Sequence, residues 1–137
     1  MKPHVLVAGN IHEAGLTLLK TQTDVTYDYV PDLTYESYAS LMPKADGLVI
    51  RTQPVRADTI ASAPRLKIVS RHGVGYDAVD VSALNARQIP LAIVGDVNSR
   101  AVAEHAMMMM LAFSKKVKHY DHAVRNDQWA LRNRFDS

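Results

Sequence analysis

The stretch LKIVSRHGVGYDAVD, from Leu66 to Asp80, decides how the rest of the sequence is interpreted. Gly73, Gly75 and Ala78 follow an apolar run and fit the pattern G-x-G-x-x-A. Asp96 lies roughly 20 residues further on, near the position of the ribose-binding acid in a dinucleotide-binding unit. Three hypotheses compete: this glycine loop binds a pyrophosphate, forms only a tight turn, or binds a small anion through its amides.

Strand-like and helical segments alternate through residues 1–97. Short apolar runs predict strands, and apolar residues at helical spacing predict helices between them. The expected strands are Val5–Gly9, Val25–Val30, Gly47–Arg51, Leu66–Arg71 and Leu91–Gly95, and the expected helices are Ile11–Thr21, Tyr35–Met42, Ala57–Ala63 and Val81–Arg87. This alternation, with short connections, predicts the α/β class: a flavodoxin-like, doubly wound, five-stranded parallel sheet covered on both faces.

The pattern changes after residue 97. Asn98 is a good N-cap, and the long interdomain helix that follows is expected to run from Arg100 to Lys118. Its middle, AMMMMLAF, is apolar around its whole circumference, which predicts burial between domains or subunits. Residues 98–137 are therefore expected to form interdomain or dimerisation helices.

Composition excludes several classes of function. The 16 basic and 14 acidic residues give a formal charge of +2 and form no run of like charges, so no nucleic-acid partner is expected. There is no cysteine, which excludes disulfides and Cys-based zinc sites. His119 and His122 have only Asp121 nearby, so no metal site is expected. No targeting or membrane-spanning segment is apparent, and a cytoplasmic location is expected.

The surroundings of the glycine loop argue against a pyrophosphate. In a dinucleotide-binding domain the glycines follow the first strand and open directly into a helix. Here the loop follows the fourth expected strand, and the next helix begins only at Asp80. Asp77 would also bring a carboxylate close to the phosphates, where like charges repel.

An anion site explains more of the sequence than a tight turn alone does. The amides of Val74 and Gly75 can form an anion-binding concavity at the carboxyl edge of the sheet. Arg51 and Arg71 end neighbouring strands, so both are expected at that edge. Two guanidinium groups and free amides suit a small carboxylate or phosphate, although the tight turn remains an alternative.

Two segments, GLVIRTQPV (47–55) and LKIVSRHGVGYDAVDVSALNARQIPLAIVGDVNSRAVAEH (66–105), resemble the D-isomer-specific 2-hydroxyacid dehydrogenases. This family includes phosphoglycerate dehydrogenases and hydroxypyruvate and glyoxylate reductases. The resemblance is tight from Gly47 to Trp129 and looser from Val5 to Tyr35. It implies a two-domain enzyme that uses NAD or NADP, with a flavodoxin-like substrate domain and a separate Rossmann domain.

The resemblance also implies roles for individual residues. The glycine loop belongs to the substrate domain, where its amides hold the carboxylate of a small 2-oxo or 2-hydroxy acid. The implied substrate-binding residues are Arg51, Arg71, Gly73, Val74, Gly75 and Asn98, and the implied cofactor contacts are Val74 and Val102. Asp96 is then a hinge residue and not a ribose ligand.

The family's catalytic arginine, carboxylate and histidine follow its true dinucleotide motif, and no residue up to Ser137 matches them. The Rossmann domain is therefore expected to be absent, with no catalytic residue in this chain and no stable binding of NAD or NADP to it. His72 and His105 are expected to be structural, with Glu104 pairing with His105 or capping helix amides. The 137-residue chain alone is expected to be inactive.

Two alternatives from other functional classes remain. The chain could be a stand-alone module that binds small carboxylates, or an assembly element built around its Met-rich helix. Because Met107–Phe113 would otherwise leave a large apolar patch exposed, we expect a homodimer through the helix at 100–118.

Overall fold

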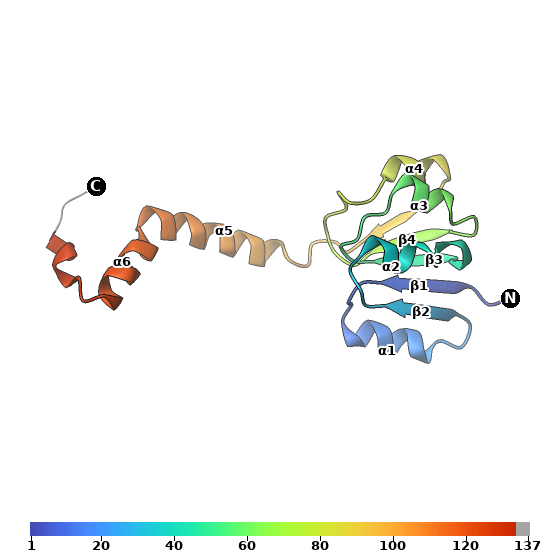
Figure 1. The fold of residues 1–137 in the computed structure, drawn as a ribbon, viewed down its shortest axis with the longest axis horizontal. Helices are drawn as coiled ribbons and strands as arrows, with labels where there is room; N and C mark the ends of the chain where they lie inside the picture. The colour runs from blue at the N-terminus through green and yellow to red at the C-terminus, as the bar shows by residue number, and fades with distance from the viewer. Residues whose placement is uncertain (134–137) are drawn as a thin grey trace. The chain divides into compact units, whose positions relative to one another are not determined.

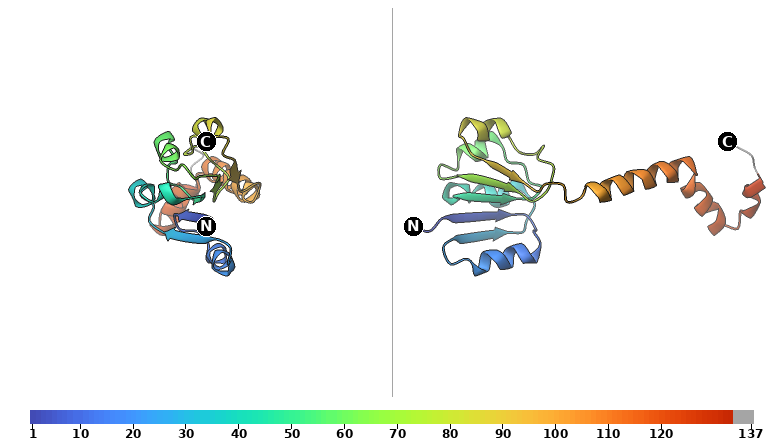
Figure 2. Two further views of the ribbon diagram at one scale, coloured as in Figure 1. Left: turned by 90° about the vertical axis from the view of Figure 1, so that its right-hand side faces the viewer. Right: turned by 180° about the vertical axis from the view of Figure 1, so that it is seen from behind.

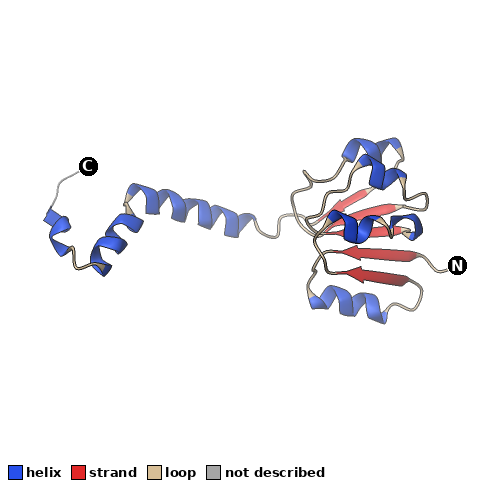
Figure 3. Cartoon of the chain, in the orientation of Figure 1, coloured by secondary structure: helices blue, strands red, loops and turns tan. Residues whose placement is uncertain are grey.

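The computed structural model describes residues 1–133 and divides the chain into two compact units, Met1–Gly95 and a second unit from Asp96 onward. The first unit is an α/β sheet structure, and the second is helical (Figures 1 and 3). Residues 134–137, at the end of the predicted helical region 98–137, lie outside the described part of the chain. None of the described helices is long and apolar enough to cross a membrane.

The elements of the first unit alternate as the sequence predicts. The strands are β1 (His4–Ala8), β2 (Thr26–Val30), β3 (Gly47–Ile50), β4 (Ile68–Arg71) and β5 (Leu91–Ile93). The helices are α1 (Glu13–Thr21), α2 (Tyr35–Ala39), α3 (Ala57–Ala61) and α4 (Val81–Ala86), with a 3₁₀ turn η1 (Met42–Lys44). β1 has the predicted length but lies one residue earlier, and the other elements are one to three residues shorter than predicted. An apolar pattern marks the middle of an element better than its ends.

All five described strands are parallel, in the order β2-β1-β3-β4-β5. This is the flavodoxin-like doubly wound order, and it confirms the predicted fold class. The order reverses between β1 and β3. On one side of β1 lies β2, and on its other side lie β3, β4 and β5, in that order. α1 lies on one face of the sheet and α2 and α3 on the opposite face (Figure 2).

The main hydrophobic core lies under α2, α3 and α4. Leu6 and Ala8 of β1 belong to it, together with Leu48, Ile50 and Val69. Tyr38, Met42, Ile60 and Leu84 pack against these strand residues from the helical side. Val7 is buried but lies outside this cluster, as the alternation of side chains along a strand requires.

A buried carboxylate fixes the amino edge of the sheet. Asp46, just before β3, is 7% exposed and accepts a hydrogen bond from the His4 N–H at 2.9 Å. The Arg65 guanidinium forms an ion pair with the same carboxylate. The His4 hydrogen bond and then Arg65 hold the pKa of Asp46 below its ordinary value. This contact joins the starts of β1, β3 and β4.

The second unit differs from its prediction. The helix expected to run to Lys118 is two helices, α5 (Ser99–Ser114) and α6 (Val117–Arg125), followed by a 3₁₀ segment η2 (Trp129–Asn133). Lys116 separates the first two with a φ of 48°, in the left-handed region. The prediction of one continuous helix was wrong. A left-handed residue that ends a helix is usually glycine, and the lysine at this position gave no sign of a helix end.

The apolar middle of α5 remains open to solvent in the described chain. No residue of α5 is buried, and Met107, Met109 and Leu111 are each more than half exposed. Phe113 is 88% exposed. An apolar surface of this kind is rarely left uncovered in a soluble protein.

Candidate functional site

The loops that follow β1, β3 and β4 meet at the carboxyl edge of the sheet. In a parallel sheet all strands end at the same edge, as the arrows of the first unit do (Figure 3). Ligands of doubly wound folds bind at this edge near the point where the strand order reverses, which here lies between β1 and β3.

The glycine loop is held in place by backbone hydrogen bonds on both sides. At its start, the His72 N–H donates to Ile50 O at 2.7 Å, and the Val94 N–H donates to Gly73 O at 3.2 Å. At its end, Val55 and Val79 form a parallel bridge. The loop is therefore anchored to the segments that follow β3 and β5.

In the part of the chain that the structure describes, the amides of residues 74–78 in this loop donate to no acceptor, and Val74 and Gly75 begin this run. Among residues 1–133, neither the Val74 nor the Gly75 N–H donates a hydrogen bond. Both residues are exposed. Adjacent unpaired N–H groups on a fixed loop are suited to an anion such as a carboxylate.

The Arg71 guanidinium lies against the start of the same loop. Its Nη1 donates to His72 O, and a Cβ at Gly73 would lie only 1.9 Å from that Nη1. Gly73 therefore lets the guanidinium lie across the loop backbone. The structure thus brings the Arg71 guanidinium and the unpaired Val74 and Gly75 amides to one loop, whereas the Gly73 N–H already donates to Arg71 O at 2.8 Å.

Arg51 lies at the same edge, one strand away. It directly follows Ile50, which is the register partner of Arg71 in the β3–β4 pair. Its Nη1 donates to Asn10 O at 2.9 Å, across the point where the strand order reverses. Arg51 and Arg71 are both partly buried, so neither is a freely solvated surface charge.

The glycine loop does not fit the pyrophosphate of a dinucleotide. No helix starts at the glycines, because α4 begins at Val81. The N-terminus of α4 is already occupied by the Asp80 carboxylate, which accepts from the Ala83 N–H at 2.9 Å. A Cβ at Gly75 would lie 3.3 Å from Asp77 Oδ2, so a second carboxylate also stands beside the loop.

The remaining predicted site residues belong to the second unit. Asn98 is the N-cap residue of α5, but its side chain makes no capping hydrogen bond, and Val102 is 59% exposed. The prediction for Glu104 was wrong: it pairs with Arg100 at 2.8 Å, because the i, i+4 spacing places these two side chains together. No cluster of three or more metal-binding side chains occurs in the described part.

One buried residue at the carboxyl edge was missed by the sequence reasoning. Gln53 is only 2% exposed, and its Nε2 donates to Asp32 O at 2.9 Å. Its Oε1 accepts from the Thr52 N–H at 3.2 Å. Gln53 lies within the segment GLVIRTQPV (47–55), but a single glutamine after a strand has no periodicity that predicts its burial.

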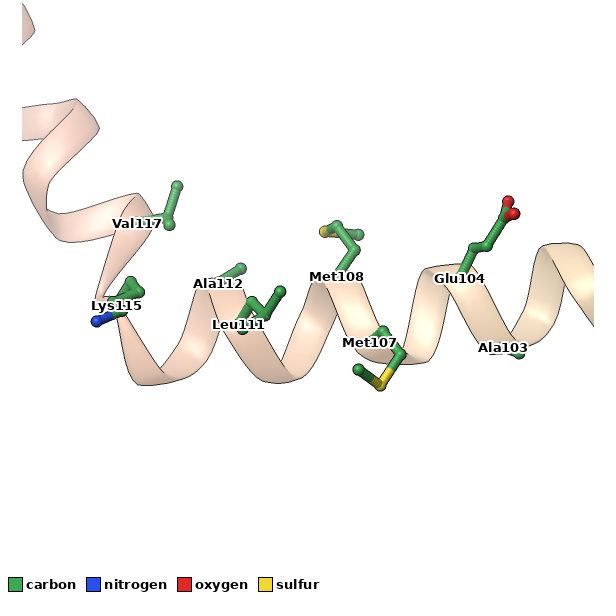
Figure 4. A pocket seen from close by; sticks show the side chains of 8 residues that line it. All are labelled: Ala103, Glu104, Met107, Met108, Leu111, Ala112, Lys115 and Val117. Atoms are coloured by element: carbon green, nitrogen blue, oxygen red, sulfur yellow. The ribbon is translucent and has the colours of Figure 1, made fainter.

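The second unit contains an apolar groove of about 700 Å³ (Figure 4). We call it the α5 groove; it is lined by Ala103, Glu104, Met107, Met108, Leu111, Ala112, Lys115 and Val117. Its lining is almost wholly apolar, with Glu104 and Lys115 toward its two ends (Figure 4).

Proteins of known name are similar to this chain over most of its length. D-3-phosphoglycerate dehydrogenase of Mycobacterium leprae is 36% identical over 128 residues, which cover 93% of this chain and 24% of that protein. Glyoxylate reductase of Pyrococcus furiosus is 30% identical over 131 residues, covering 94% of this chain and 39% of the relative. The chain thus spans between about a quarter and two fifths of the length of these relatives.

Solved structures agree with these sequence matches. The NADPH-dependent glyoxylate/hydroxypyruvate reductase of Sinorhizobium meliloti, in complex with citrate, matches with a TM-score of 0.76 and 25% identity. The match covers 98% of this chain and 42% of that one. Residues 5–130 match the family model of the D-isomer specific 2-hydroxyacid dehydrogenase catalytic domain. The chain therefore belongs to the D-isomer-specific 2-hydroxyacid dehydrogenase family.

Proposed function

We propose that this chain is the substrate-binding part of an NAD- or NADP-dependent D-2-hydroxyacid dehydrogenase, and that its glycine loop binds the carboxylate of a 2-oxo or 2-hydroxy acid. The observation that carries the proposal is the pair of unpartnered amides at Val74 and Gly75 beside the Arg71 guanidinium. Amides supply directed donors, and the guanidinium supplies the positive charge that a carboxylate requires.

The role of this site is orientation of the substrate. A carboxylate fixed on the glycine loop holds the adjacent carbon in one place, which lowers the entropic cost of the reaction. In the complete enzyme the nicotinamide cofactor supplies the hydride. The family resemblance assigns Asn98 to substrate binding and Val74 and Val102 to cofactor contacts, and the exposure of both valines is compatible with this.

Arg51 is proposed to bind a second anionic group of the substrate. It stands at the reversal point of the sheet, one strand from Arg71, and keeps four of its five N–H donors beyond the bond to Asn10. A guanidinium binds a distal carboxylate or phosphate equally well. This fits relatives named for phosphoglycerate and a structural neighbour solved with citrate.

The chain on its own is proposed to be inactive and not to bind NAD or NADP stably. None of its described residues provides a dinucleotide cradle at the glycine loop, as the geometry of Asp77 and Asp80 indicates. The assay is NADH or NADPH oxidation with glyoxylate or hydroxypyruvate by the pure 137-residue chain. Sustained turnover would overturn this part of the proposal.

Homodimerisation through α5 is a further part of the proposal. The α5 groove and the exposed Met109 and Phe113 form an apolar surface in the second unit. A second copy of the same helix would bury this surface, which otherwise exposes apolar area to water at a free-energy cost.

Binding is tested by amide NMR on the 137-residue chain titrated with D-glycerate, a 2-hydroxy acid with a single carboxylate. The Val74 and Gly75 signals should move saturably, and Arg71→Gln should weaken binding about tenfold. Lys67→Gln is the matched control, because it also removes one positive charge. Lys67 directly precedes the first residue of β4, whereas Arg71 is the last residue of that strand. Absence of shifts in the loop, or equal weakening by both variants, would contradict the proposal.

A further inference from the structure

Gln53 is a buried polar group at the carboxyl edge with no role in the site described so far. The described chain buries three polar or charged residues: Asp46, Gln53 and Thr59. Asp46 fixes the amino edge, and Thr59 bonds Tyr35 within the helical layer at 2.8 Å. Of these three residues, only Gln53 lies in a loop at the carboxyl edge, where it follows Arg51 after β3. Burying an amide costs free energy unless its donor and its acceptor are hydrogen-bonded.

The hydrogen bonds of Gln53 join the loop after β2 to the loop after β3. Its Nε2 donates to Asp32 O after β2, and its Oε1 accepts from the Thr52 N–H after β3. The Asp32 loop is itself fixed, because the Asp32 carboxylate accepts from the Thr34 N–H at 2.7 Å. Gln53 thereby connects the Thr52 amide, which directly follows Arg51, to the loop that contains Asp32.

Gly9 completes the contact between Gln53 and Arg51. Its φ of +93° lies in the left-handed region, and a Cβ there would lie 2.9 Å from both Arg51 Cβ and Gln53 Oε1. The Gly9 backbone is therefore packed against the base of the Arg51 side chain and the Gln53 amide at once. The Arg51 N–H donates to Ala8 O at 3.2 Å, and its Nη1 donates to Asn10 O. Arg51 is thus restrained at its backbone, its Cβ and its guanidinium.

We propose that Gln53 is a positioning residue for Arg51: it fixes the Arg51–Thr52 backbone so that the guanidinium is presented to the distal anionic group of the substrate. This rests on the proposed function, in which Arg51 binds that group. Glutamine suits the position because it donates with one end and accepts with the other, whereas a glutamate could not donate to Asp32 O. Gln53 itself touches no substrate.

The test uses four forms of the 137-residue chain besides wild type: Gln53→Met, Arg51→Met, the double variant, and Thr59→Val as a control. Methionine keeps the length of glutamine but removes both hydrogen bonds. Thr59→Val removes hydrogen bonds of a buried hydroxyl to Tyr35 and Asp58, neither of which belongs to the candidate anion site. Affinities for D-3-phosphoglycerate and D-glycerate are measured by NMR, and urea unfolding records the stability of each form.

Gln53→Met should weaken D-3-phosphoglycerate binding about three- to tenfold and change D-glycerate binding less than about twofold. It should have no further effect in the Arg51→Met background, since it acts through Arg51. Thr59→Val should leave both affinities unchanged even where it lowers stability. Additive losses in the double variant, or an equal loss for both ligands, would overturn the positioning role.

A second measurement separates this inference from the proposed function. The Arg51 Nε–Hε signal of the ligand-free chain should shift in Gln53→Met and remain in place in Thr59→Val. If D-glycerate does not bind the wild type, the proposed function fails, and the ligand-free signal still decides the role of Gln53. An Arg51 signal identical in wild type and Gln53→Met would refute that role.

Discussion

Val55 and Val79 lie 24 positions apart in sequence and form a parallel bridge between the segments that follow β3 and β4. The Val55 N–H donates to Ala78 O and the Asp80 N–H donates to Val55 O, each at 2.8 Å. Both valine side chains are buried. The bridge joins the segment that carries Arg51 to the loop that carries the free amides, so backbone hydrogen bonds connect the two halves of the candidate anion site.

This bridge predicts a sharp contrast in amide hydrogen exchange within a few residues. The Val55 and Asp80 amides are hydrogen-bonded and should exchange slowly, near the rate set by global unfolding. The Val74 and Gly75 amides have no acceptor and should exchange fast. Saturating D-glycerate should slow the second pair and leave the first unchanged. Slow exchange at Val74 and Gly75 in the free chain would show that these donors are already occupied.

Gly9→Ala should destabilise the first unit. The positive φ of Gly9 disfavours any side chain, and the new Cβ would lie 2.9 Å from Arg51 Cβ and Gln53 Oε1. We expect a loss of about 1–3 kcal/mol in the free energy of unfolding, measured with urea. Gly15→Ala is the matched control: it lies within α1, where the nearest atom is 3.4 Å away, and should stabilise by about 0.5–1 kcal/mol. Equal effects of the two variants would contradict the role of Gly9.

Asp46 should make stability depend on acid pH. Its pKa in the folded chain is held below the ordinary 3.8, first by the His4 N–H and then by Arg65. The unfolded chain therefore binds a proton at higher pH than the folded chain does. This stabilisation is complete above the ordinary pKa and is lost as the pH falls below about 4 through the lowered value.

The measurement is the urea midpoint between pH 6 and pH 2.5. Asp46→Asn should lower the midpoint at pH 6 and flatten its fall at acid pH. The urea midpoint of Asp46→Asn should still fall somewhat at acid pH, because Lys44 also lowers the pKa of Asp28 and protonation of Asp28 costs stability in the same pH range. Asp24→Asn is the control, since the Asp24 carboxylate is exposed and pairs with no group among residues 1–133. An unchanged acid slope in Asp46→Asn would show that Asp46 is not the group responsible.

The α5 groove predicts self-association that one charge can prevent. Met108→Glu places a carboxylate in the apolar lining and should convert a dimer into a monomer, as measured by light scattering. Leu18→Glu makes the same change at a 63% exposed position of α1 and should leave the dimer intact. A wild-type chain that is monomeric at every concentration tested would refute dimerisation through α5.

The sequence by itself determined the sheet and the place of the site. Apolar runs such as Val5–Gly9 and Leu66–Arg71 are local patterns, and their alternation with helices permits only a handful of arrangements of parallel strands. Since parallel strands all end at one edge, the strand-end positions of Arg51 and Arg71 already predicted that they would lie together. The same local logic placed the start of α4 correctly at Asp80, which is its N-cap residue.

Only the tertiary structure decided which groups are paired and which remain free. The burial of Gln53 depends on Gly9 and Asp32, two residues that approach it only after three strands have assembled. The bridge between Val55 and Val79 likewise joins residues whose sequence patterns are unrelated. The periodicity of apolar residues predicts which face of an element is buried, but no sequence pattern predicts hydrogen bonds between residues distant in sequence. The unpaired amides of the glycine loop became identifiable only once the hydrogen bonds of the folded chain were known.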